Sequence, residues 1–233
     1  MIKTENIEVF NWDGAIRGMR NPLNSWYKSD TKHCDDIASC GECRCFNNAE
    51  EYVNGCHNPD NGYNPVVLGG ADLSLMRKLV KAGSDHRKFL RQIMVSMDIT
   101  APLYWWKEFD TYKVGTVANS CSTMHCIHAK EFVPDDFSHD RIAGEYLESL
   151  NLTIGILNLA RRRYLETKDK THWDAMIQLL PTSYNQLRTV TLNYEVLFNI
   201  HRARHTHKLD EWRSLCETIA ALPYFREICL EED

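Results

Sequence analysis

The sequence lacks a long apolar run, a readable leader and an excess of positive charge, and each absence narrows its function. The most apolar stretch, 150–160, is interrupted by Asn151, Thr153 and Asn158, so we exclude a membrane-spanning helix and expect no membrane partner. The first six residues, Met-Ile-Lys-Thr-Glu-Asn, have neither a basic n-region nor an apolar h-region, so we expect no signal peptide and a cytoplasmic protein. The net charge of −5 argues against a DNA-backbone binder, and we expect no nucleic-acid partner.

What is present is the composition of a globular chain. Hydrophobic residues make up 43% and charged residues 25% of the 233 positions, which is enough apolar content for a core and excludes a disordered chain. We find no internal repeat and no low-complexity tract. We therefore predict a single domain over residues 1–233.

Hydrophobic periodicity predicts more helix than strand. Period-2 alternation favours strands at 4–10, 93–99 and 188–193, and 111–118 is expected to be extended or a loop. Spacing near 3.6 residues, with helix start and stop signals, predicts helices at 14–20, 71–82, 85–92, 102–109, 140–167, 171–180, 193–204 and 208–222. The prediction is an α+β fold, dominated by helices around a small sheet.

Residues 29–70 differ from the rest and predict a Cys-rich loop insertion. They are poor in aliphatic residues, and a loop of this length indicates a function or a metal staple. The candidate ligands of a structural zinc ion are Cys34, Cys40, Cys43, Cys45 and Cys56. Cys40-x-x-Cys43 has the spacing of a thiolate pair, but the paired motif of a zinc ribbon is lacking. Reduced, unliganded thiols are an equally good interpretation, and iron–sulfur or disulfide chemistry is a third.

Two blocks of the sequence have a distinctive spacing. The first contains His86, Ile99-Thr-Ala-Pro102 and the run from Lys107 to Thr116, and the second contains Leu180-Pro181, Asn193, Asn199 and Arg204. Both resemble the flavin-dependent thymidylate synthases. In that family, a histidine, a strand and a proline-led helix precede the signature Arg-Gln-Trp-Phe-Arg-His-Arg-x-x-Ser-x-Asn-Glu-x-Ser-x-Arg-Tyr. The resemblance covers about residues 71–222 and the N-terminal strand, and gives 29–70 no counterpart.

The signature is retained in part. The retained positions are Ser122, Asn193, Asn199, Arg204 and the charge of Lys107. The replaced positions are Glu108 for the glutamine, Thr111-Tyr112-Lys113 for Arg-His-Arg, Ser120 for the glutamate, Met124-His125 for Arg-Tyr, and Ile177 for an arginine before Leu-Pro. Most of the cations that bind phosphate in the family are therefore absent from these positions.

The resemblance implies an enzyme that methylates dUMP reductively to dTMP. In the family, FAD held between subunits delivers a hydride, and methylenetetrahydrofolate donates the one-carbon unit to C5 of the uracil. It thus implies a homotetramer with FAD as cofactor, NADPH and methylenetetrahydrofolate as co-substrates, and a pyrimidine nucleotide as ligand. Because such catalysis rests on positioning and electrostatics, the lost cations leave two alternatives: a catalytically diverged nucleotide- or flavin-binding module on the same scaffold, or modification of another pyrimidine nucleotide at C5.

Roles for single residues follow from the resemblance. Arg204 is the candidate catalytic residue, the cation that faces the uracil. The candidate FAD contacts are Lys113, Tyr112, Asn193 and Asn199, and the candidate substrate contacts are Lys107, Glu108, Ser122 and Arg204. Structural interpretations stay open beside these: a helix C-terminal charge for Arg204, a helix N-cap for Asn193, core packing for Tyr112 and a turn for Ser122.

Overall fold

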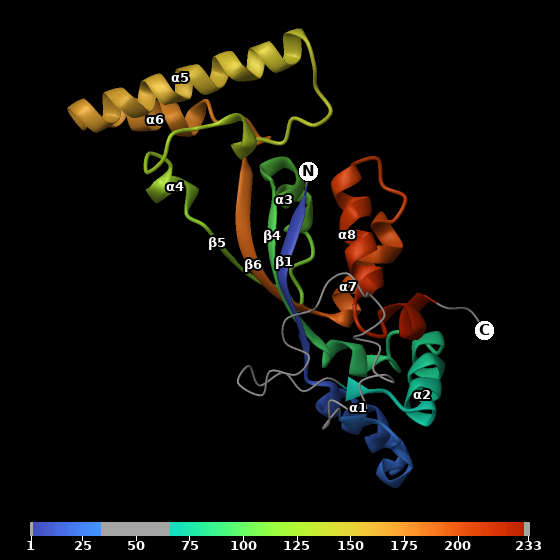
Figure 1. The fold of residues 1–233 in the computed structure, drawn as a ribbon. Coiled ribbons are helices and arrows are strands. Elements are labelled where there is room, and N and C mark those ends of the chain that lie inside the picture. The colour runs from blue at the N-terminus through green and yellow to red at the C-terminus, as the bar shows by residue number, and fades with distance from the viewer. Residues whose placement is uncertain (1, 34–65, 231–233) are drawn as a thin grey trace, which may run out of the picture. The chain divides into compact units, whose positions relative to one another are not determined.

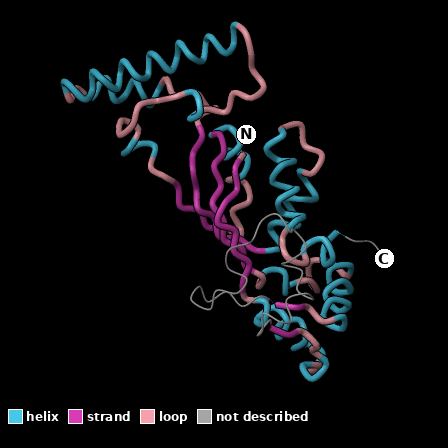
Figure 2. Tube along the Cα trace, in the orientation of Figure 1, coloured by secondary structure: helices cyan, strands magenta, loops and turns pink. Residues whose placement is uncertain are grey.

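The computed structural model describes residues 2–33 and 66–230, in which helices predominate over strands (Figures 1 and 2). The chain divides into two compact units, which we describe separately. Unit 1 comprises Met1–Ile7, Ser96–Thr191 and Thr206–Leu215, and unit 2 comprises Glu8–Val95, Leu192–His205 and Cys216–Asp233. Across the described ranges, no helix combines the length and the apolar character that crossing a membrane requires. The five cysteines proposed as zinc ligands lie outside the described residues.

The main sheet has four strands in the order β1 (Lys3–Phe10), β4 (Met94–Pro102), β6 (Asn185–Asn193) and β5 (Val117–Ser120). β5 runs antiparallel to β6, with Val117 opposite Thr191 and Ser120 opposite Arg188. In β4 every second side chain is buried, as the alternation in the sequence predicted. The helix-rich α+β fold and the three predicted strands are thus confirmed.

The helices of unit 1 are α3 (Leu103–Phe109), α4 (Thr123–Cys126), α5 (Glu145–Thr167), α6 (Lys170–Gln178) and the first residues of α8 (Asp210–Ala221). α6 lies along α5 (Figure 1). Their shared core consists of Ile127, Phe132, Phe137, Leu150, Ile154, Leu157, Ala160 and Met176. Within it, the buried amide of Asn158 accepts a hydrogen bond from Phe132 N (2.9 Å) and donates one to Phe132 O (2.8 Å). This pair holds the chain between α4 and α5 against the helix.

The start of α5 corrects the prediction. The helix begins at Glu145 rather than at 140, because Gly144 takes φ +56° and ψ −133°, a conformation that no helix contains. The apolar spacing that begins at Ile142 therefore extends into a segment that is not helical.

Unit 2 contains α1 (Trp12–Arg20), α2 (Gly70–Lys81), α7 (Tyr194–Arg204), the remainder of α8, a 3₁₀ helix η6 (Lys88–Arg91) and a π-helix η8 (Arg226–Leu230). A two-stranded ribbon pairs β2 (Lys32–His33) with β3 (Val66–Val67). Tyr194 lies edge-to-face against Trp12 (5.6 Å between ring centroids) and Phe225 (5.2 Å). The helix predicted at 85–92 is mostly wrong. Gly83 has φ +102°, and its carbonyl accepts from both His86 N and Arg87 N, so the chain turns before η6.

Two buried ion pairs stabilise unit 2. Arg20 Nε donates to Asp72 Oδ1 over 2.6 Å, and both side chains are at least 96% buried. Asp72 Oδ2 also accepts from the hydroxyls of Ser29 and Thr31 and from the backbone N–H groups of Asp30 and Thr31. Arg87 makes a bidentate contact with Glu195 of α7. Asp72 thereby fixes the first residues of the predicted Cys-rich insertion.

Candidate functional site

The structure distributes the predicted site residues over both units. Unit 1 holds Lys107, Glu108, Tyr112, Lys113 and Ser122, and unit 2 holds Asn193, Asn199 and Arg204. Each group is therefore built up within its own unit.

The end of α3 rests on an aromatic base. Trp105, Trp106 and Phe109 are at most 2% exposed, and Trp105 contacts Trp212 of α8 (4.7 Å between centroids). Glu108 Oε2 accepts a hydrogen bond from Trp212 Nε1 (2.9 Å). Because this bond fixes the carboxylate at the C-terminal end of α3, Glu108 is held in place before any ligand arrives.

The segment after α3 carries the residues that replace Arg-His-Arg. The Tyr112 ring packs against Trp212 (6.0 Å) and Phe109 (6.5 Å), so packing accounts for its position. Lys113 is exposed and has no ion pair among the residues that the structure describes. Thr116 follows in a turn closed by Thr116 N donating to Lys113 O (3.4 Å), and its hydroxyl is buried with no partner in the described chain.

β6 contacts both the end of α3 and the loop that leads into α4, through residues that no sequence motif had identified. Arg188 pairs with Asp110 at the end of α3 (2.8 Å), and its guanidinium lies over the Trp106 ring (4.2 Å). Gln186 Nε2 donates to Cys121 O (3.1 Å) and Thr123 Oγ1 (3.0 Å). No sequence motif predicts these contacts, because each joins residues more than sixty positions apart.

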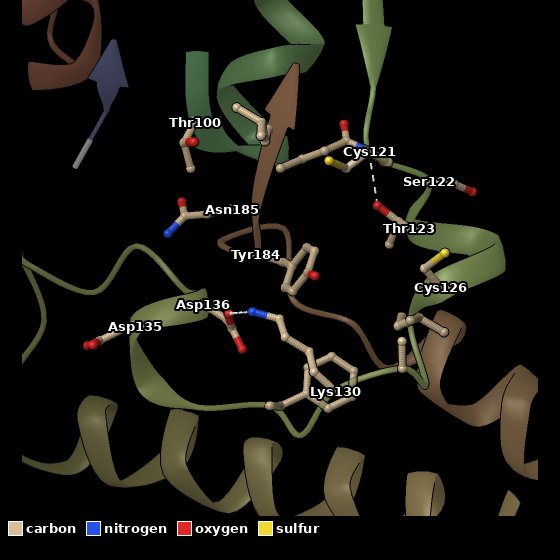
Figure 3. Close-up of a pocket in the computed structure, with 15 residues that line it drawn as sticks. Thr100, Cys121, Ser122, Thr123, Cys126, Lys130, Asp135, Asp136, Tyr184 and Asn185 are labelled. Carbon is tan, nitrogen blue, oxygen red and sulfur yellow. Dashed lines mark hydrogen bonds and ion pairs between the residues drawn. The ribbon is translucent and has the colours of Figure 1, made fainter. Parts of the chain in front are cut away.

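A pocket of about 510 Å³ lies between the loop at Ser122, the segment before α5 and the start of β6 (Figure 3). Its polar lining consists of Thr100, Cys121, Ser122, Thr123, Cys126, Lys130, Asp135, Asp136, Tyr184, Asn185 and Gln186. The hydroxyl of Ser122 accepts from His125 N (3.1 Å) and so caps α4. Ser122 is thus both the turn residue that the sequence allowed and a wall of the pocket.

One ion pair dominates the charge of this pocket. Lys130 Nζ lies 2.5 Å from Asp136 Oδ1 (Figure 3), and this hydrogen bond raises the pKa of Lys130. Burial, with the charge of Asp136, raises the pKa of the neighbouring Tyr184 phenol. At neutral pH the pocket therefore presents a neutral phenol and an ammonium.

In unit 2, Asn193 and Asn199 occupy different environments. Asn193 is 7% exposed, and its Oδ1 accepts from Val196 N (3.1 Å), so the N-cap interpretation is confirmed. Asn199 is exposed on α7, although both of its neighbours are buried. Water can hydrate its amide, so the position of Asn199 does not by itself require a bound ligand.

Arg204 lies at the C-terminal end of α7, half-buried, and next to α8. Burial raises the pKa of the Cys216 thiol to about 11, while the Arg204 charge acts in the opposite direction. His201 and His205 stack in parallel beside it (5.4 Å between centroids, 4° between planes), and burial followed by the His205 charge lowers the pKa of His201. In the described part of the chain, no group of three or more metal-ligating side chains is arranged to hold a metal ion.

Structural comparison decides what this arrangement resembles. A thymidylate synthase X from Helicobacter pylori, solved with FAD and dUMP, superposes with a TM-score of 0.65 at 14% identity, covering 99% of this chain and 98% of the other. The chain has the fold of the flavin-dependent thymidylate synthases. The UMP/dUMP methylase PolB from Streptomyces cacaoi, bound with 5-Br dUMP, matches with a TM-score of 0.56 at 15% identity over 97% of this chain and 93% of that one. No protein-family model and no curated protein sequence matches.

The thymidylate synthase-like fold accounts for the part of the prediction that depended on spacing. The helix that begins after Pro102 and the Asn193 cap before α7 both lie where the two-block spacing required. At this level of identity the likeness extends to the fold, so the roles of the single site residues stay predictions.

Proposed function

We propose that the protein binds a flavin and a pyrimidine nucleotide and methylates the nucleotide reductively at C5, with dUMP as substrate and dTMP as product. The observation that carries the proposal is the match over nearly the full length of both chains to enzymes solved with FAD and dUMP, or with a brominated dUMP. The retention of Ser122, Asn199 and Arg204 supports it. The same proposal includes NADPH and methylenetetrahydrofolate as co-substrates. It also includes one functional domain, a homotetramer and a cytoplasmic site of action.

The residues around Lys113 fit a flavin diphosphate. A diphosphate needs a cation and hydrogen-bond donors, and Lys113 is an exposed ammonium with no ion pair in the described chain. When bound and reduced by NADPH, the flavin would supply the hydride for the one-carbon unit. In this proposal Lys113 holds the diphosphate.

The pocket at Ser122 is our candidate nucleotide site. It is the cavity that a predicted substrate residue lines, and its volume of about 510 Å³ lies within the usual range for a small-molecule site. Its lining holds one cationic side chain, Lys130, which is paired with Asp136, and the family positions occupied here by Met124 and Ile177 provide no cation.

Arg204 lies in unit 2, and its assignment is separate from this pocket: it is our candidate for the cation that stabilises negative charge on the uracil ring.

The Lys113 assignment predicts weaker flavin binding on substitution. Lys113→Ala is expected to raise the Kd for FAD about tenfold, because a charge-assisted contact is lost, whereas Lys113→Arg keeps the charge and restores binding. Titration of the purified protein with FAD, followed by quenching of flavin fluorescence, measures both values. Lys32→Ala, which removes an exposed charge of the same sign in unit 2, is the control.

Two experimental outcomes test this proposal and the alternative of a diverged binding module. Protein that stays colourless after incubation with FAD, and is stabilised by no nucleotide, contradicts both. Protein that dUMP stabilises in a thermal-shift assay, but that releases no tritium from C5 of labelled dUMP with reduced flavin and folate present, supports the module instead. The loss of the phosphate-binding cations favours this second candidate.

A further inference from the structure

In the pocket of Figure 3, side-chain acceptors are already engaged within the chain. Asp136 accepts at both carboxyl oxygens, from Lys130 Nζ at Oδ1 (2.5 Å) and from Val133 N at Oδ2 (3.0 Å). Asn185 Oδ1 accepts from the hydroxyl of Ser138 (2.8 Å). A ligand that donates to one of these oxygens therefore competes with a hydrogen bond that the protein makes by itself.

The amide of Gln186 has a fixed direction. Its Oε1 accepts from Arg188 Nε (3.0 Å), and its Nε2 donates to Cys121 O (3.1 Å) and to Thr123 Oγ1 (3.0 Å), as the dashed line in Figure 3 shows. A guanidinium can only donate, so the carbonyl end of the amide faces Arg188 and the amino end faces Thr123. Because the Thr123 oxygen accepts this bond, its proton is directed elsewhere, and no group in the described chain receives it.

Donors of the pocket therefore remain open to a ligand. Among them are the hydroxyls of Thr123 and Tyr184 and the amide Nδ2 of Asn185, which donate to no other group in the described ranges. Burial raises the pKa of Tyr184, so the phenol keeps its proton at neutral pH. The carboxyl group of Asp135 points away from these three side chains (Figure 3). Towards a ligand, the pocket offers mainly donors.

We propose that the pocket selects its nucleotide by the carbonyl oxygens of the base, with Thr123, Tyr184 and Asn185 as the donors. Gln186, held by Arg188, is the positioning residue that directs the Thr123 proton. The inference rests on the proposed function, which assigns the nucleotide to this pocket.

The substituent at C4 decides between the two pyrimidines. Uracil presents a carbonyl oxygen there, whereas cytosine presents an amino group. An amino group opposite these donors leaves N–H groups unpaired on both sides. The Asn185 amide nitrogen cannot accept in their place, since it only donates. An unpaired polar group costs more than a hydrogen bond that is simply absent, so the pocket favours dUMP over dCMP.

Binding of dUMP and dCMP to the full chain provides the test, because both nucleotides carry the same sugar and phosphate. Isothermal titration calorimetry is expected to give a Kd for dCMP at least about tenfold above the Kd for dUMP. Tyr184→Phe and Thr123→Val each remove one hydroxyl with little change of shape. Each is expected to weaken dUMP binding about fivefold or more, and to leave the Kd for dCMP within about twofold. Tyr146→Phe is the matched control, since it removes the same hydroxyl from a side chain that is 67% exposed on α5.

Gln186→Glu separates a positioning role from a structural one. A carboxylate at this position accepts the Thr123 proton, which turns the hydroxyl away from the ligand, and it can still pair with Arg188. The preference for dUMP over dCMP is therefore expected to fall at least about fivefold. A purely structural role weakens both nucleotides equally and leaves the preference unchanged. Circular dichroism melting curves establish that each variant is folded.

The outcomes distinguish this inference from the proposed function. Wild-type protein that binds dUMP and dCMP equally overturns the inference but leaves the proposed function in place. The same conclusion follows if neither Tyr184→Phe nor Thr123→Val changes the preference. Wild-type protein that binds neither nucleotide contradicts the assignment of the pocket, and the inference with it.

Discussion

Replacing Asp72 with alanine is expected to lower the free energy of unfolding by about 3–5 kcal/mol, because the change leaves a buried guanidinium without its counter-ion. Arg20 is 3% and Asp72 0% exposed, so water cannot substitute for the lost carboxylate. The carboxylate also accepts from Ser29, Asp30 and Thr31, and these donors lose their acceptor at the same time.

Urea-induced unfolding followed by circular dichroism measures this loss. Asp13→Ala is the control in the same unit: its contact with His33 is partly exposed to solvent, and its removal is expected to cost less than about 1 kcal/mol. The double variant Arg20→Met/Asp72→Leu removes both charges and is expected to recover the part of the loss that comes from the unpaired guanidinium, but not the part that comes from the donors of residues 29–31. If Asp72→Ala behaves like the Asp13 control, the ion pair does not contribute as proposed.

Asp72 also predicts how stability depends on pH. Burial acts to raise the pKa of Asp72, but hydrogen bonds from Thr31 and Ser29 and the contact with Arg20 outweigh it, so its pKa in the folded protein lies below the usual range. The stabilisation is therefore complete above the carboxyl pKa of the unfolded chain, and is lost as the pH falls below about 4. Acid titrations should show the stability difference between the wild type and Asp72→Ala shrinking in that range, and a constant difference would contradict the assignment.

Arg204→Ala is expected to reduce turnover at least about a hundredfold, the usual cost of removing a group that stabilises charge in the transition state. Arg204→Lys keeps a charge but not the planar geometry, and an intermediate rate is expected. Release of tritium from C5 of labelled dUMP, with FAD, NADPH and methylenetetrahydrofolate present, measures the rate.

Arg202 provides the matched control for Arg204. It lies on the same helix, is exposed, and contacts the Phe198 ring (5.6 Å). Arg202→Ala is expected to leave the rate within about twofold of the wild-type rate. Because Arg204 lies close to Cys216, unfolding curves must show that Arg204→Ala is as stable as the control. Equal rates for the two variants would assign Arg204 to a helix C-terminal charge and to nothing more.

Much of the fold could be predicted from the sequence because its signals are local. Proline fixes the start of α3, alternation marks β4, and the apolar spacing of α5 extends through Thr167 as predicted. The errors arise where one backbone conformation overrides the pattern. Gly144 delays α5, and Gly83 closes a turn that restricts the next helix to four residues.

In the candidate site, only the roles that a residue plays within its own segment could be predicted from the sequence. The capping role of Asn193 follows from its place before an apolar run, and the structure confirms it. Gln186 contacts the loop that leads into α4, and Arg188 contacts the end of α3. Both contacts depend on the pairing of strands that are distant in sequence. The same holds for Lys130 and Asp136, whose pocket forms only when β6 meets the segment before α5.

The Lys130–Asp136 pair gives the pocket a built-in counter-ion. A phosphate that recruits Lys130 must separate it from Asp136, which leaves a carboxylate beside an incoming anion. An uncharged heterocycle enters without breaking the pair. The cavity therefore discriminates by charge before it discriminates by shape, and it admits the base of a nucleotide more readily than its phosphate.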